Sequence, residues 1–220
     1  MNMKNHSELP LYRLHPEFNN DIIELKNIPK AIYKAGEELV SRDNKELYQI
    51  DLILFGLMDR TVNLLDALIF CLEKLNIVAA GSLLRNLIEN LALITYFAEH
   101  SNGKIAAESI LKYGRPKIFE KNKLRNLRDS EIIDFLNEKF VLAKSIYIET
   151  SAFVHFSPKH IFGITKPLDK NKRLFEGHIS IGNENWQKPE IRRFIEVTKA
   201  ISKKILQYID GFGDFIKSNL

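Results

Sequence analysis

The most apolar stretch of the chain runs from Ile77 to Glu99 and reads IVAAGSLLRNLIENLALITYFAE. Because it is apolar on almost every side, it is typical of a helix in the middle of a bundle. Four polar residues interrupt it: Arg85, Asn86, Glu89 and Asn90. Arg85 and Glu89 are four residues apart and share one face, which Tyr96 continues. The pattern therefore predicts a central helix that carries a charged pair.

The chain before residue 42 shows a weaker helical pattern. Residues 1–18 lack a clear apolar period, so we expect an extended or loosely docked arm there. Apolar positions then predict a helix that starts near residue 20. Proline disrupts a helix interior, so Pro29 should break or kink this helix before it resumes over 29–41.

A second long helix should precede the central one. Asp43 followed by Glu46 matches a capping box, and apolar residues recur at helical spacing over 47–75. Asn76 then leaves room for only a short connection. Helices joined by short connections are usually antiparallel neighbours, so we expect this arrangement here.

Helical periodicity resumes after the central helix. His100 to Gly103 should end that helix, and a short helix is expected over 104–113, before Gly114 and Pro116. Asp129 and Ser130 then match the start of a longer helix that continues to about Phe156.

The last part of the chain changes pattern twice. Residues 160–182 contain two short β-branched or aromatic runs around a polar turn, which indicates a small β-hairpin. Pro189 should then start a final helix, with Gly211 and Gly213 marking its end or a kink. The fold class that we predict is mainly α: an up-and-down helical bundle with a small β-hairpin inserted before the last helix. Its domains would be the arm 1–18 and a single bundle over 19–220, a length that suits one core.

Composition narrows the functional classes. Cys71 is the single cysteine, so no intramolecular disulfide or thiolate zinc cluster can form, and a cytoplasmic location is expected. A membrane partner is not expected, because a bilayer-spanning central helix would place Arg85 and Glu89 in the membrane interior. The histidines are scattered and the sequence has no HExxH, P-loop or GxGxxG motif, so we expect no metal and no cofactor.

Positive charge is concentrated between residues 112 and 128. This basic stretch contains seven cations and one acid, Glu120, whereas the whole chain has a net charge of +4. The cations are Lys112, Arg115, Lys117, Lys121, Lys123, Arg125 and Arg128. The basic stretch fits either a solvated surface helix and loop, or an electrostatic footprint for RNA or another polyanion.

Three helical faces that we expect to be buried carry polar residues. Arg85 and Glu89 lie on the central helix, Asp66 on the helix before it, and a third set at i, i+4 and i+8 on the helix after residue 129. The third set is Tyr147, Ser151 and His155. Buried charges need partners, so these faces could meet at one level of the bundle.

Two interpretations of this polar set remain open. In the first, it is a structural network that fixes helix register. In the second, His155 is a general acid or base, Arg85 stabilises a phosphate or an oxyanion, and Glu89 orients one of them. Asp66, Tyr147 and Ser151 would then contribute hydrogen bonds. Such a site could cleave RNA without metal, because the 2′-hydroxyl can act as the nucleophile.

The spacing of these residues resembles that of a known group. Arg-x3-Glu (Arg85, Glu89) followed by Tyr-x3-Ser-x3-His (Tyr147, Ser151, His155) resembles a large uncharacterised family of bacterial helical domains, over roughly residues 45–210. More loosely, the arrangement is similar to HEPN domains, helical bundles of which many are metal-independent ribonucleases in toxin and phage-defence systems. Those enzymes carry an Arg-x4-6-His motif in one segment, whereas Arg85 and His155 come from different helices.

The resemblance implies a cytosolic protein that binds or cleaves RNA in a defence or toxin context. The alternative is a non-enzymatic module that binds a protein partner or self-associates, for example as a homodimer.

Overall fold

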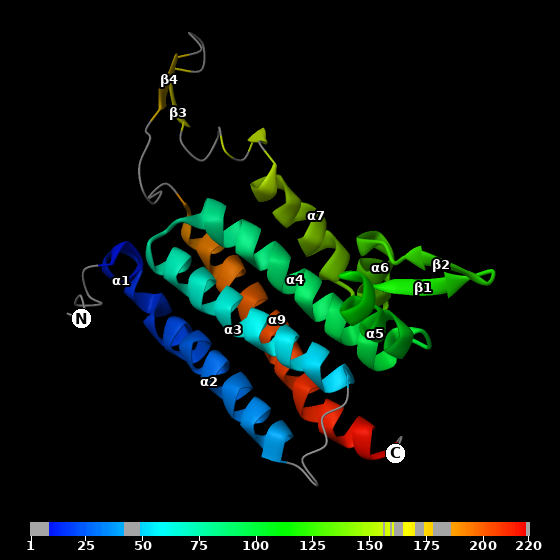
Figure 1. The fold of residues 1–220 in the computed structure, drawn as a ribbon. Helices are drawn as coiled ribbons and strands as arrows, with labels where there is room; N and C mark the ends of the chain where they lie inside the picture. Colours follow the sequence, from blue (N-terminus) through cyan, green and yellow to red (C-terminus); the bar gives the residue numbers. More distant parts are fainter. Residues whose placement is uncertain are drawn as a thin grey trace.

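The chain forms a mainly α-helical bundle around α4 (Ile77–Glu99), as Figure 1 shows. The computed structural model describes residues 9–41, 49–155, 157–158, 160, 165–169, 174–177 and 186–218. α4 begins and ends where the apolar pattern predicted. It packs against α3, α5, α6, α7 and α9, so it is the central helix of the fold.

Four long helices form one side of the bundle. These are α2 (Asn19–Ser41), α3 (Gln49–Glu73), α4 and α9 (Lys188–Ser218). α2 packs on α3 and α9, and α4 packs on the same two helices, so the four surround one core. α3 and α7 run in the opposite direction to α2, α4 and α9 (Figure 1), which confirms the up-and-down helical bundle.

Three shorter helices cover the other side of α4. They are α5 (Gly103–Tyr113), α6 (Asp129–Lys139) and α7 (Ala143–Val154). The single helix expected from Asp129 to Phe156 is therefore wrong. The helix ends before Phe140, whose backbone angles (φ −137°, ψ 88°) are not helical, and a new helix begins three residues later. The break lets both pieces turn an apolar face to α4.

A small hairpin precedes α9, as predicted. β3 (Thr165–Asp169) pairs antiparallel with β4 (Leu174–Gly177). The first strand lies later than expected, because it includes 166–169, which belong to the polar segment KPLDKNKR that reads as the turn.

A further hairpin occupies the basic stretch, where we had considered only a surface helix and loop. β1 (Lys117–Glu120) pairs antiparallel with β2 (Lys123–Asn126). The two turn residues, Lys121 and Asn122, have φ of 48° and 62°. Positive φ at both central positions is the backbone of a two-residue turn that matches strand twist, and asparagine tolerates it better than most residues.

The segment expected as an arm is partly folded. α1 (Pro10–Leu14) and the 3-10 helix η2 (Pro16–Phe18) dock on the bundle through Leu11 and Phe18, which are both fully buried. The expectation of an extended segment to residue 18 is therefore wrong for residues 10–18. The Asp43–Glu46 capping box lies outside the described residues.

Two expected helix breaks are absent. α2 continues through Pro29, because Ile28 and Ile32 keep the buried face continuous across it and packing outweighs the lost backbone hydrogen bond. α9 likewise continues past Gly211 to Ser218. By length and composition, α4 could cross a membrane, and 56% of its most apolar window is buried inside the bundle.

Candidate functional site

Arg85 on α4 is the centre of a polar network that joins α4 to α7. Its Nη2 donates to the Tyr147 hydroxyl over 2.6 Å, its Nη1 donates to Ser151 Oγ, and its Nε donates to Glu89 Oε1 over 3.3 Å. The guanidinium carbon also lies over the Tyr147 ring, 4.1 Å from the centroid. The side chains of Arg85 and Glu89 are 19% and 27% exposed. The structure thus brings together four of the residues selected from the sequence.

The hydrogen bonds of this Arg85 network are those of a structural link between α4 and α7. Each guanidinium nitrogen of Arg85 donates to a protein acceptor, so three of its five N–H groups are used inside the network. The Ser151 hydroxyl accepts from Arg85 and donates to the Tyr147 carbonyl over 2.7 Å, which leaves no base in position to activate it. Burial raises the pKa of Tyr147, and the Glu89 carboxylate raises it further, so its hydroxyl stays protonated.

Small residues on α4 set the close approach of α7. A Cβ placed on Gly81 would overlap the Phe153 ring, so only glycine allows this contact. One residue later, Ser82 Oγ donates to the Phe153 carbonyl over 3.1 Å at the end of α7. These contacts hold α7 at the level where Tyr147 and Ser151 reach Arg85.

His155 does not join the Arg85 network. α7 ends at Val154, and His155 has extended backbone angles (φ −103°, ψ 146°). Residues at i, i+4 and i+8 share one face only within a continuous helix. Because α7 ends before His155, this residue is not on the face of Tyr147 and Ser151. The His155 side chain is exposed, and no described hydrogen bond or ion pair links it to Arg85 or Glu89. The structure therefore does not place His155 where a general acid or base of this network would have to be.

Asp66 is also absent from the network, because it is exposed on α3. α3 instead presents Arg60 and Thr61 to the other polar face of α4. Arg60 Nη1 donates to Asn90 Oδ1 over 3.0 Å, while Asn90 Nδ2 donates to the Leu57 carbonyl over 2.9 Å and lies 2.5 Å from Thr61 Oγ1. Arg60 was not singled out from the sequence, because one arginine in a long helix carries no distinctive spacing.

The basic stretch lies at one corner of the molecule, on the end of α5, the β1–β2 hairpin and the start of α6. Lys112, Arg115, Lys121, Lys123 and Arg128 are exposed, and Lys117 is half-buried. Two aromatic rings are exposed among them, Tyr113 at 40% and Phe119 at 57%. The ammonium groups of Lys112 and Lys117 lie 5.2 and 4.3 Å from the centroid of the Tyr113 ring.

Arg125 is the exception within the basic stretch. It donates to Glu120 Oε2 over 2.6 Å and to both carboxylate oxygens of Glu131 over 2.7 and 2.8 Å. The bidentate pair with Arg125 lowers the pKa of Glu131 to about 2. Arg125 therefore links the hairpin to α6 and is not a free anion-binding group.

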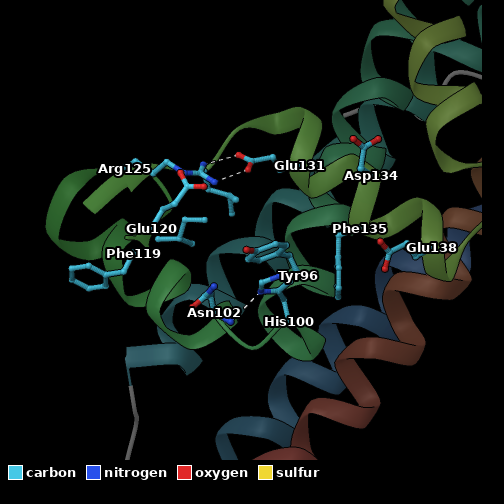
Figure 2. Close-up of a pocket in the computed structure, with 12 residues that line it drawn as sticks. Tyr96, His100, Asn102, Phe119, Glu120, Arg125, Glu131, Asp134, Phe135 and Glu138 are labelled. Atoms are coloured by element: carbon cyan, nitrogen blue, oxygen red, sulfur yellow. Dashed lines mark hydrogen bonds and ion pairs between the residues drawn. The ribbon is translucent and has the colours of Figure 1, made fainter. Parts of the chain in front are cut away.

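An open pocket of about 390 Å³ lies between α4, α6 and the β1–β2 hairpin (Figure 2). The ring of Tyr96 stacks on His100 with centroids 4.2 Å apart, and Phe135 meets the two rings edge-on. From the sequence, His100 is predicted only as part of a helix end. The four-residue spacing of Tyr96 and His100 was a usable signal, but nothing in the sequence links them to Phe135.

Tyr96 therefore does not extend the face of Arg85 and Glu89 into one site, because it belongs to this separate pocket. A second, smaller cavity of about 30 Å³ lies between α7 and α9, and Arg85 lines neither of the two. Within the described part of the chain, no group of three His, Cys, Asp or Glu side chains is arranged to hold a metal ion.

Comparisons with protein-family models, with curated proteins and with solved structures find no match to this chain.

Proposed function

We propose that this protein is a non-catalytic module that binds single-stranded RNA through the basic stretch. The observation that carries the proposal is the set of six cations around two exposed aromatic rings at one corner of the molecule. Within the described residues, no carboxylate pairs with any of these six cations. They are Lys112, Arg115, Lys117, Lys121, Lys123 and Arg128.

Charge and aromatic surface together favour a nucleic acid. Unpaired lysines and arginines release counterions when they contact phosphates, and this term dominates non-specific affinity. Exposed rings add base stacking, which is sequence-tolerant and requires unpaired bases. Tyr113 and Phe119 supply such rings beside the cations. Arg125 offsets one of the two acidic charges of Glu120 and Glu131, which lie beside this surface.

RNA rather than DNA is proposed because the helical arrangement is loosely similar to HEPN domains, many of which act on RNA. Binding without cleavage is proposed because Arg85 is held by Tyr147, Ser151 and Glu89, and because His155, the candidate general acid or base, lies outside this network. The Arg85 network then has the structural role of fixing α7 against α4.

The test is fluorescence anisotropy with a labelled single-stranded RNA, measured without divalent metal. We expect affinity to fall steeply between about 50 and about 200 mM salt, with a logarithmic slope of about −0.7 for each phosphate contact. Lys121→Gln with Lys123→Gln should weaken binding and flatten this slope. The matched control is Lys30→Gln with Lys34→Gln on α2, which removes the same charge from exposed positions on another helix.

Salt-independent binding, or an equal loss in the two double variants, would contradict the proposal. Failure to bind any single-stranded RNA at low salt would also overturn it. Cleavage of the RNA by the wild type would refute the non-catalytic part, and loss of that cleavage in Arg85→Ala would move the chemistry to the Arg85 network.

A further inference from the structure

The open pocket beside the hairpin has a ring cluster as its wall. Tyr96 comes from α4, His100 from the α4–α5 connection and Phe135 from α6, with centroid distances between 4.2 and 5.4 Å. His100 is held in place because its Nδ1 accepts the backbone N–H of Asn102 over 3.0 Å. A wall of interlocked rings keeps its shape without a ligand, and a volume of about 390 Å³ suits a small molecule.

One polar group on the wall of this pocket has no described partner. Tyr96 is 3% exposed, and no described residue hydrogen-bonds its hydroxyl. Figure 2 shows the hydroxyl pointing away from Phe135, toward the side of the pocket where Glu120 and Arg125 lie. Because Tyr96 lines the open pocket and no described residue bonds its hydroxyl, a ligand can form that hydrogen bond. Burial also raises the pKa of Tyr96, which keeps the group protonated.

The charges around the pocket are mostly negative. Four carboxylates line it, against the single guanidinium of Arg125. They are Glu120, Glu131, Asp134 and Glu138. Arg125 holds Glu120 and Glu131, and Lys144, from outside the lining, holds Asp134 at 2.7 Å. Glu138 is exposed and pairs with no described residue.

The lining therefore selects against anions. A phosphate or carboxylate ligand would face an excess of like charge, whereas a cation would gain from Glu138 and from the faces of the rings. Phe135 already attracts an ammonium, because Lys139 Nζ lies 5.7 Å from its centroid. The Tyr96 hydroxyl can accept a hydrogen bond from such a group.

We propose that the pocket between α4, α6 and the β1–β2 hairpin binds a small organic cation, an ammonium group carried on an aromatic or other apolar stem. The apolar stem packs against the rings and against Ile118 and Leu127. The ammonium donates to the Tyr96 hydroxyl or to Glu138. The proposal does not rest on RNA binding, since the pocket recognises the opposite charge, although Phe119 borders both surfaces.

The test compares three probes of nearly one shape by isothermal titration calorimetry: 2-phenylethylamine, 2-phenylethanol and phenylacetate. We expect the amine to bind about tenfold more tightly than the alcohol, and the acid to bind more weakly than both. Equal affinities for amine and alcohol, tighter binding of the acid, or no binding of the amine at millimolar concentration would each overturn the proposal.

Two variants place the binding in this pocket. Tyr96→Phe keeps the ring and removes only the unpartnered hydroxyl, so the fold should be retained while amine affinity falls. Glu138→Gln should lower amine affinity and leave alcohol affinity unchanged, a difference that a purely structural role would not produce. Glu37→Gln, on the exposed surface of α2, is the matched control for charge. If it weakens amine binding as much as Glu138→Gln, the amine is responding to overall charge and the pocket is not its site.

Discussion

The guanidinium of Arg85 on α4 lies over the ring of Tyr147 on α7 and donates to the hydroxyl of the same residue over 2.6 Å. Arg85 therefore contacts Tyr147 through both the face of its ring and its hydroxyl. With Ser151 and Glu89, this contact makes a joint between two helices whose sequences are about sixty residues apart. We expect this link between α4 and α7 to contribute to the stability of the fold.

Arg85→Ala should lower the free energy of unfolding by about 1–3 kcal/mol, because it leaves Glu89, Tyr147 and Ser151 without their shared donor. Urea unfolding followed by circular dichroism measures this loss. Arg193→Ala is the control, since Arg193 also joins two helices, through Glu149 at 2.6 Å, but is 64% exposed. It should cost about 0–1 kcal/mol. Equal losses in the two variants would mean that the Arg85 network is no more than a surface ion pair.

Gly81→Ala should destabilise the protein by about 1–3 kcal/mol, because the new Cβ overlaps the Phe153 ring and pushes α7 from α4. Gly56→Ala on α3 is the matched change, since no atom lies within 4 Å of the added Cβ. That variant should gain about 0.5–1 kcal/mol from helix propensity. Thermal unfolding of both proteins checks the prediction, and a stabilised Gly81→Ala would contradict the packing seen between α4 and α7.

Arg125→Gln should raise the pKa of Glu131 from about 2 toward its ordinary value of 4.5, because the bidentate pair is lost. In the wild type the folded-state pKa lies below the unfolded one. The pair therefore stabilises the fold above about pH 4.5, and that contribution disappears as pH falls from 4.5 toward 2.

An NMR titration of the Glu131 side-chain carboxyl carbon measures this shift directly. Lys123→Gln is the control, because it removes a hairpin cation that forms no described ion pair with Glu131. An unchanged Glu131 pKa in Arg125→Gln would show that Arg125 is not its partner in solution.

His155→Ala should change stability by less than about 0.5 kcal/mol, because the side chain is exposed beyond the end of α7. It should also leave RNA affinity as in the wild type. The comparison with Lys121→Gln and Lys123→Gln in the same anisotropy assay makes this result informative. A loss of RNA affinity in His155→Ala alone would place the binding surface near α7 and away from the hairpin.

The positions of the helices could be predicted from the local spacing of apolar residues wherever the apolar face was long. Ile77–Glu99 could be bounded from its apolar residues, because a helix that packs against five others needs apolar side chains along most of its length. Arg85, Glu89, Tyr147 and Ser151 were found for a related reason: a spacing of four sets side chains on one helix face, and partly buried polar groups require partners.

Other features of the site depended on where each helix ends and on which helices it packs against. His155 lost its expected face because α7 stops one residue before it, and Asp66 faces solvent because α3 turns Arg60 and Thr61 to α4. The short charged strands of the β1–β2 hairpin had no apolar alternation to reveal them.

By itself, then, the amino-acid sequence determined a mainly α bundle centred on α4 and the polar residues that cross from α4 to α7. Tertiary structure alone decided which of those residues meet, and it created the pocket of Tyr96, His100 and Phe135. The physical reason is the separation along the chain over which each effect acts. Helical periodicity acts between neighbours three or four residues apart, whereas a pocket exists only after helices from distant parts of the chain have packed.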